Sequence, residues 1–184
     1  MIIVMAGLPG TGKSMLARAI AAKLPLLILD KDVLRAALFP PEEIEYSTSQ
    51  DDFVVEMMLQ LANFYILKDS RRNIILDGRP FSKERQVNTV LHYAQTHTWD
   101  LRIIYCTCPD EIVKARLEHD VTTEKHLAAN RNYDMYLRMK AQFEPLKAPH
   151  LCVDMSEPLD TCVSRSLEYL GLCSNHLPYL EESK

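Results

Sequence analysis

The segment GLPGTGKS at residues 7–14 carries the most specific chemical pattern in the chain. It matches G-x-x-x-x-G-K-[ST] and lies between a predicted strand and a predicted helix, a context that a chance glycine-rich turn would lack. Its glycines let successive backbone N–H groups turn toward one anion at the positive end of the following helix. Lys13 would then reach the β- and γ-phosphates of a nucleotide, and Ser14 would hold Mg²⁺. The predicted nucleotide-binding residues of this loop are Gly7, Leu8, Pro9, Gly10, Thr11, Gly12, Lys13, Ser14 and Met15.

Two carboxylates, Asp30 and Asp32, follow the apolar run LLIL, and Arg35 comes three residues after Asp32. Ligands of open parallel sheets bind at the carboxyl ends of the strands, which is where this run would deliver both aspartates. A carboxylate there could accept the proton of an attacking hydroxyl, and Arg35 could hold an anionic group of the acceptor or the transferred phosphoryl group. Either aspartate could instead cap the helix that follows. We assign catalysis to Asp32 and leave both roles open for Asp30.

A third carboxylate, Asp77, closes the apolar run NIILD at residues 73–77. At the end of a strand beside the P-loop strand, a carboxylate would orient Mg²⁺ through water. The alternative is a turn aspartate that precedes Gly78. We predict Ser14 and Asp77 as the metal-binding residues.

The elements that position these residues follow from the hydrophobic pattern. Continuous apolar runs, typical of strands covered on both faces, occur at 2–6, 26–29, 73–77, 101–106 and 150–154. Helix-period segments lie near 13–23, 32–38, 51–70, 83–97, 109–118, 132–143 and 159–170. This alternation predicts an α/β fold with a mainly parallel sheet and helices on both sides. We expect one domain over residues 1–173, a polar loop at 39–50 and a tail at 174–184. Within helix 51–70, Met57, Met58 and Phe64 could be core residues or could line the acceptor pocket, and we favour the core.

Composition limits the classes of function. The 184 residues are 47% hydrophobic and 25% charged, with a net charge of −4. That charge argues against a protein whose main task is to grip a long nucleic-acid backbone, although short nucleic-acid ends remain open. No apolar run approaches the roughly 20 residues that span a bilayer, and the N-terminus lacks the features of a signal peptide. We therefore expect a cytoplasmic protein, monomeric or homodimeric, with no membrane partner.

The P-loop, the following strand and the stretch Asp32-Val33-Leu34-Arg35 together resemble the small kinases of the polynucleotide 5′-kinase and zeta-toxin type. These kinases are relatives of gluconate, shikimate and adenylate kinases, and the resemblance covers most of residues 1–170. It implies the three-layer P-loop NTPase fold, with a five-stranded sheet ordered 2-3-1-4-5 and a small lid. It also implies that Asp32 activates the acceptor hydroxyl and that Arg35 positions phosphate.

The resemblance adds further candidate residues. The stretch LDGRPFSKER resembles nucleoside monophosphate kinases and polynucleotide-kinase relatives, which makes Arg79 and Arg85 candidate acceptor-binding residues; a solvated helix-start charge fits each equally well. In these kinases an arginine near the end of helix 109–118 leads into a lid and a second leaves from its far side; Arg116 and Arg131 would take these places around a lid at 119–131 and neutralise charge on the phosphates. In the loop after the last strand, Asp154 and Ser156 would frame the base, or form a plain loop.

These observations together predict a kinase that uses Mg²⁺ and ATP and transfers the γ-phosphoryl group to a hydroxyl. Asp32 would be the base, and Lys13 and Arg116 would stabilise the developing charge. The acidity of the chain favours a small acceptor such as a metabolite, a nucleoside or an antibiotic. The alternatives are a polynucleotide 5′-hydroxyl kinase, and a regulatory ATPase or switch that has no phosphoryl acceptor.

Overall fold

A five-stranded parallel sheet forms the centre of the molecule, whose computed structural model describes residues 1–123 and 132–172. The strand order β2-β3-β1-β4-β5 confirms the expected order 2-3-1-4-5. All neighbouring strands pair in parallel. Each predicted apolar run matches its strand to within one residue at either end. The strands are β1 (Ile2–Ala6), β2 (Leu26–Asp30), β3 (Asn73–Asp77), β4 (Leu101–Thr107) and β5 (Leu151–Asp154).

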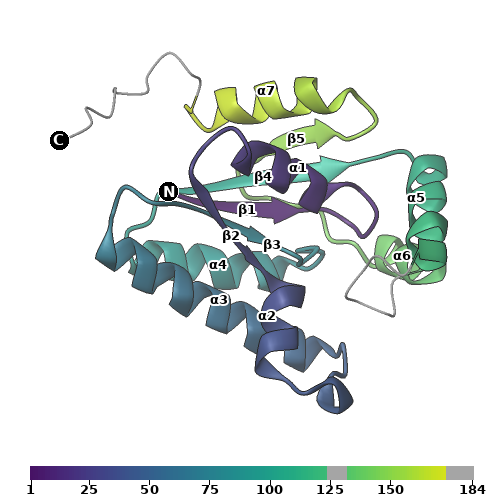
Figure 1. The fold of residues 1–184 in the computed structure, drawn as a ribbon, viewed down its shortest axis with the longest axis horizontal. Coiled ribbons are helices and arrows are strands. Elements are labelled where there is room, and N and C mark those ends of the chain that lie inside the picture. Colours follow the sequence, from purple (N-terminus) through teal and green to yellow (C-terminus); the bar gives the residue numbers. More distant parts are fainter. Residues whose placement is uncertain (124–131, 173–184) are drawn as a thin grey trace.

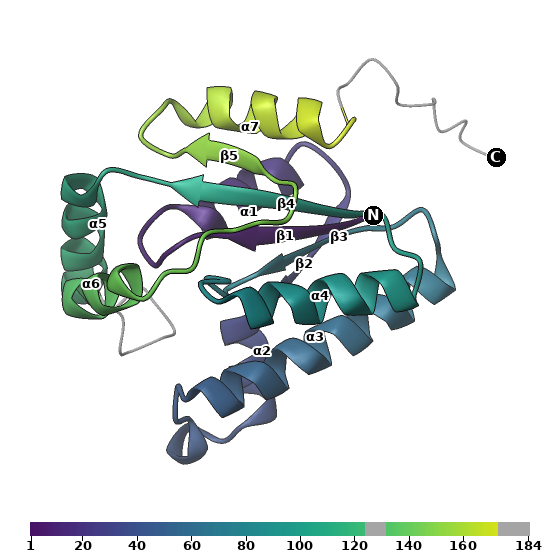
Figure 2. The same ribbon diagram turned by 180° about the vertical axis from the view of Figure 1, so that it is seen from behind.

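Helices cover both faces of the sheet, as the continuous apolar runs predict. On one face lie α1 (Lys13–Ala21) and α7 (Leu159–Tyr169), and on the other lie α3 (Thr48–Lys68) and α4 (Glu84–Thr96), as Figures 1 and 2 show from opposite sides. Alternate residues of the fully buried strand β1 serve the two cores. Ile2 and Val4 pack into the core with α3 and α4, while Ile3 and Met5 pack into the core with α1 and α7.

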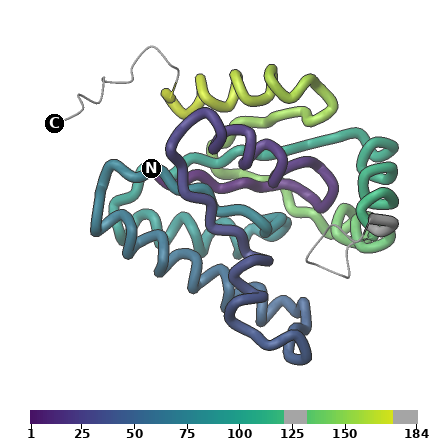
Figure 3. The backbone as a smooth tube through the Cα atoms, in the orientation of Figure 1, coloured from purple at the N-terminus to yellow at the C-terminus, as the bar shows by residue number. Residues whose placement is uncertain are grey.

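The remaining helices lie toward the carboxyl ends of the strands. The chain runs from β2 directly into α2 (Lys31–Leu38), passes through the short helix η1 (Pro41–Glu43), and enters α3 (Figure 3). After β4 it forms α5 (Asp110–Thr123), and α6 (Tyr133–Ala141) follows the gap in the described residues. Val113, Leu117 and Tyr136 of these two helices are buried against Leu8. The P-loop is therefore packed directly against the helices that flank the predicted lid.

Helix α3 differs from expectation in two respects. It begins at Thr48 rather than 51 because Ser47 caps it, accepting a hydrogen bond from the backbone N–H of Gln50 at 3.2 Å. Its buried face is also narrower than expected. Met58 is a core residue, but Phe64 is 59% exposed, so the prediction that Phe64 belongs to the core was wrong. Six residues along a helix rotate the side chain by about 120° away from the face of Met58.

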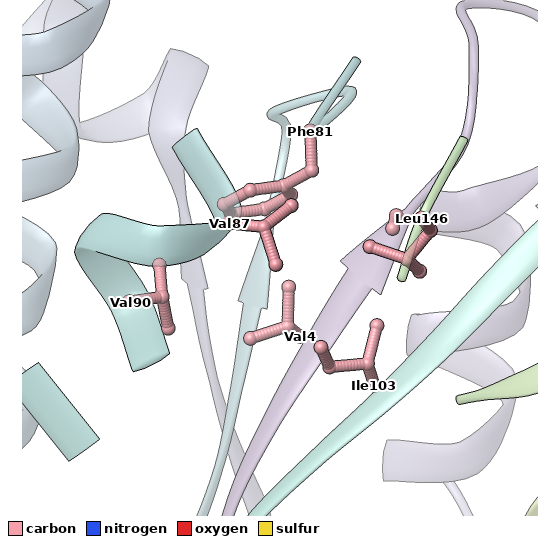
Figure 4. Close-up of a pocket in the computed structure, with 7 residues that line it drawn as sticks. Val4, Phe81, Val87, Val90, Ile103 and Leu146 are labelled. Atoms are coloured by element: carbon pink, nitrogen blue, oxygen red, sulfur yellow. The ribbon is translucent and has the colours of Figure 1, made fainter. Parts of the chain in front are cut away.

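A small apolar cavity lies between β1, β4 and α4 (Figure 4). It has a volume of about 10 Å³ and its lining offers no polar side chain. A site of this size and polarity stays dry and is a packing defect rather than a ligand site. Its lining residues are Val4, Ala6, Phe81, Val87, Val90, Ile103 and Leu146. In the described part of the chain, no helix combines the length and the apolarity that crossing a membrane requires.

Candidate active site

The P-loop has the backbone conformation that its glycines predict. Gly7, Gly10 and Gly12 have φ angles of +131°, +78° and +96°, which side chains with a Cβ rarely adopt. At Gly7 space is also lacking, since an added Cβ would lie 2.3 Å from the carbonyl oxygen of Cys106 on β4. Gly12 stands at the N-cap of α1 and has no side chain with which to cap it. The first N–H groups of α1 are thus available to an anion.

Lys13 and Ser14 begin α1 directly after this turn. Lys13 is only 6% exposed, and its Nζ donates a 2.8 Å hydrogen bond to the carbonyl oxygen of Leu8. The hydroxyl of Thr11 donates to the same oxygen at 2.7 Å. The ammonium group therefore lies folded over the loop that is expected to hold the phosphates. Ser14 is half-buried at the first turn, and Met15 is exposed.

Asp77 ends β3 beside the P-loop strand and is 1% exposed. Its Oδ1 is buried and has no hydrogen-bond partner among the described residues. A buried carboxylate oxygen of this kind normally has a partner, so the atom fits a role in holding a cation or its water. The described residues contain no cluster of three or more His, Cys, Asp or Glu that could hold a metal.

The two aspartates after β2 have different surroundings. Asp30 lies opposite Asp77 in the β2–β3 register, and its Oδ1 accepts hydrogen bonds from the backbone N–H groups of Asp32 and Val33 at 2.8 and 3.2 Å. Asp30 is therefore the N-cap of α2, one of the two roles considered for it. Asp32, on the first turn, accepts a 2.7 Å hydrogen bond from Arg35 Nη1. Its side chain is 13% exposed, so it can still be reached from solvent.

Arg35 is buried, and its guanidinium is shared between two carboxylates. It is 1% exposed and pairs with Asp51 of α3 as well as with Asp32. Its charge also lies 5.1 Å from the centre of the Tyr46 ring. Lys31, at the start of α2, lies 2.7 Å from Asp51 and 3.6 Å from Asp32. Burial lowers the pKa of Lys31 to about 8, because desolvation outweighs the attraction of Asp32.

Arg79 and Arg85 converge on one carboxylate. Arg79 pairs with Oδ1 of Asp52, and Arg85 Nη1 lies 2.9 Å from Oδ2 of the same residue. Arg79 is 3% exposed, whereas the Arg85 side chain is 59% exposed. Partial burial would raise the pKa of Asp52, but the hydrogen bonds from Arg85 and Arg79 outweigh it and hold that pKa below its ordinary value.

A groove of about 580 Å³ opens where these arginines meet the start of α3 and the end of α6. The backbone N–H of Gly7 donates to the carbonyl oxygen of Pro80, which lines the groove, so the groove adjoins the P-loop. Its lining is predominantly polar and includes both predicted acceptor-binding arginines. The lining residues are Thr48, Asp51, Arg79, Pro80, Ser82, Lys83, Arg85, Gln86, Met139, Gln142 and Glu144.

Arg116 of α5 reaches the P-loop from the lid side. Its Nη2 donates to the carbonyl oxygen of Met155 at 2.9 Å, and its Nη1 lies 3.5 Å from the carbonyl oxygen of Gly10. An added Cβ at Gly12 would lie 3.3 Å from the same Nη1. The guanidinium therefore lies directly beside the loop, as a charge-stabilising role requires. Arg131 and most of the predicted lid at 119–131 lie outside the described residues.

Comparison with known proteins identifies the family. A sequence profile described as an AAA domain matches residues 2–146, most of the chain. The chain belongs to the AAA domain family. Among curated protein sequences, none matches it.

Solved structures share the fold of this AAA domain at low sequence identity. APS kinase of Mycobacterium tuberculosis, in complex with AMPPNP and APS, has 17% identity and a TM-score of 0.69, covering 92% of this chain and 96% of its own. A sugar kinase from Janibacter has 17% identity and a TM-score of 0.68, with 94% and 95% covered. A gluconokinase from Sinorhizobium meliloti has 17% identity and a TM-score of 0.63, with 94% and 97% covered. At this identity the comparison establishes the fold.

The loop after β5 completes the carboxyl edge of the AAA domain. Asp154 lies opposite Thr107 in the β4–β5 register, and its Oδ1 accepts hydrogen bonds from the backbone N–H and the hydroxyl of Ser156 at 2.9 and 2.7 Å. The backbone N–H, followed by the hydroxyl, holds the pKa of Asp154 below its ordinary value. Both side chains are engaged with each other, so this pair stabilises a turn beside Met155.

Sequence reasoning missed four residues of the AAA domain that this geometry brings into the site. Met155 is 2% exposed and would touch a Cβ at Gly12. Lys31, Asp51 and Asp52 supply the partners of the predicted residues Asp32, Arg35, Arg79 and Arg85. The only available signal was the adjacent pair Asp51-Asp52, which is also what the first turns of an ordinary helix contain.

Proposed function

We propose that this AAA domain is a kinase that transfers the γ-phosphoryl group of Mg-ATP to a hydroxyl of a small acceptor. The observation that carries the proposal is the pair of Asp32 and Arg35 at the same edge of the sheet as the P-loop, with a polar groove leading to it. A nucleotide hydrolase or switch would leave this pair and the groove without a chemical task. The shared fold of APS kinase, sugar kinase and gluconokinase supports the same class of reaction.

In the proposed reaction each residue has one role. Asp32 accepts the proton of the acceptor hydroxyl as the oxygen attacks the γ-phosphorus, the bond from the γ-phosphorus to the β–γ bridging oxygen breaks, and ADP leaves. Arg35 keeps the Asp32 carboxylate oriented. Lys13 leaves the carbonyl of Leu8 and binds the phosphates, and Arg116 neutralises charge that develops on the transferred group. Ser14 and Asp77 would hold Mg²⁺, which would supply positive charge to offset that of the phosphates.

The proposal includes the extent of the kinase domain and its setting. We place the domain at residues 1–173, with a lid at 119–131 and a tail at 174–184. Asp154 and Ser156 would border the base through the turn that they form. We also propose a cytoplasmic protein that acts as a monomer or a homodimer.

The test is a search for a phosphorylated product. The protein is incubated with Mg-ATP and a pool of sugars, sugar acids, nucleosides, antibiotics and 5′-hydroxyl oligonucleotides, and mass spectrometry then detects any compound that has gained a phosphoryl group. Wild type is compared with Asp32→Asn and with Asp100→Asn, a control at the amino-terminal edge of β4.

We expect a product that is lost with Asp32→Asn and retained with Asp100→Asn. An oligonucleotide that gains a 5′-phosphoryl group would instead establish a polynucleotide 5′-kinase. If wild type and Asp32→Asn hydrolyse ATP equally and no compound gains phosphate, the kinase proposal fails and a regulatory ATPase takes its place.

A further inference from the structure

The contacts of Arg79 point to a ligand that the protein itself does not supply. Arg79 is 3% exposed and lines the polar groove, yet its Nε is buried with no hydrogen-bond partner among the described residues. A buried guanidinium that serves only the fold normally has its donors satisfied, because an unsatisfied donor forfeits the solvation it had in water. Burial also lowers the pKa of Arg79, and Asp52 opposes this effect. The arginine is therefore held in the groove at a cost in free energy.

The charge balance around Arg79 favours an anion. Two guanidinium groups, those of Arg79 and Arg85, share the single carboxylate of Asp52, with one arginine on each oxygen. This leaves an excess of one positive charge where Arg79 and Arg85 line the groove. The other charged residues of the lining are already paired: Lys83 with Glu144, and Asp51 with Lys31 and Arg35.

Asp52 has the properties of an occupant that can be displaced. Its side chain is 42% exposed, in contrast to the buried Arg79. A carboxylate bridging two guanidinium groups is also the geometry in which arginines recognise carboxylate, phosphate or sulfate groups of ligands. Rotation of the Asp52 side chain toward solvent would free the same two donors for an anionic group entering the groove.

We propose that the phosphoryl acceptor carries an anionic group, a phosphate, sulfate or carboxylate, which binds Arg79 and Arg85 and displaces Asp52. This inference rests on the proposed function, since it names the class of compound that the kinase accepts. Asp51 lines the groove and also pairs with Arg35, which holds Asp32, so one end of the groove reaches the catalytic pair. An acceptor bound by its anionic group would extend its hydroxyl along the groove toward Asp32.

The experiment measures anion binding separately from turnover. Isothermal titration follows sulfate, and ribose 5-phosphate against ribose, with Mg–AMPPNP present so that the P-loop is already filled. Asp52→Asn removes the resident charge and leaves both arginines, while Arg85→Ala removes the more exposed arginine without emptying a buried position. The matched controls are Glu56→Gln, one turn further along α3 and outside the groove lining, and Arg71→Ala, whose side chain is 90% exposed.

We expect Asp52→Asn to bind sulfate and ribose 5-phosphate about tenfold more tightly than wild type, and Arg85→Ala to bind them at least about tenfold more weakly. Ribose should bind all variants equally, and both controls should behave as wild type. Unchanged sulfate affinity in Asp52→Asn and Arg85→Ala would overturn the inference, as would phosphorylation of neutral acceptors alone. If anion binding responds as expected while no compound is ever phosphorylated, the anion site stands and only the kinase proposal falls.

Discussion

The tight turn at Gly7 allows a quantitative test of how firmly the P-loop is fixed against β4. We consider Gly7→Ala, for which the φ angle of +131° and the 2.3 Å approach of an added Cβ to the Cys106 carbonyl oxygen act together. The unfavourable φ angle costs about 1–3 kcal/mol, and the overpacking costs about 1–3 kcal/mol more. The reduced entropy of the unfolded chain returns about 0.4–1 kcal/mol. The net expected loss is roughly 1–5.5 kcal/mol in the free energy of unfolding.

Gly171, just after α7, is a matched control. Its φ angle of +67° is also positive, but an added Cβ would meet nothing within 4 Å. Gly171→Ala therefore carries a conformational cost of about 1–2 kcal/mol without the clash, of which the unfolded-state term offsets about half. The two variants contain the same chemical change and differ in the space around it.

Urea unfolding followed by circular dichroism measures both variants, and thermal unfolding repeats the comparison. Because the conformational and unfolded-state contributions largely cancel, we expect Gly7→Ala to lose about 1–3 kcal/mol more than Gly171→Ala, and each kcal/mol corresponds to about 2–4 °C in Tm for a chain of this size. Equal losses for the two variants would show that β4 yields to the added methyl group, and the account of a fixed P-loop would be refuted.

Three further outcomes follow from the site. Because the pKa of Lys31 is lowered to about 8, folding stability should rise as pH increases from about 8 to 10.5, by up to about 3 kcal/mol, and urea unfolding of Lys31→Met should lose this rise. Arg116→Ala should lower kcat by about 100-fold or more in a steady-state assay, whereas the loss of its hydrogen bond to Met155 should cost only about 1–3 kcal/mol of stability; a change in KM alone would contradict charge stabilisation. Tyr136→Phe removes a 2.7 Å hydrogen bond to Asp110 and should lower the free energy of unfolding, measured in urea, by about 1–3 kcal/mol. An unchanged free energy of unfolding would show that this hydrogen bond does not stabilise the fold.

The fold could be predicted because its signals are local. Continuous apolar runs mark strands that are covered on both faces, and every strand end was placed within one residue. The strand order came from the resemblance to known kinases, since hydrophobic periodicity carries no information about which strands are neighbours. Helix α3 shows the limit: the apolar pattern located it, but the Ser47 cap set its start. Phe64 is exposed because six residues of helix turn its side chain about 120° away from the face of Met58.

Site residues could be predicted only where a single continuous stretch of sequence contains the whole signal. Lys13 and Asp77 lie where a motif and a strand end place them. The partners of Arg35 and Arg79 could not be foreseen, because Asp51 and Asp52 lie 16 and 27 residues away from them and come together only when α3 packs beside α2 and the β3–α4 loop. A carboxylate pair in a helical sequence does not indicate which cations it will meet.

The position of β1 in the sheet has a consequence for synthesis of the chain. Ile2, in the strand of this sheet that comes first in the sequence, pairs with Ile74 on one side and Leu101 on the other. At about 5–20 residues per second, a ribosome needs roughly 5–20 s to supply both neighbours. During that interval the fully apolar strand β1 has no strand beside it. Both of its pairings join residues far apart in the sequence, so each has to overcome the entropy of closing a long loop. We expect slow folding in which formation of the P-loop is a late event, coupled to the arrival of β4.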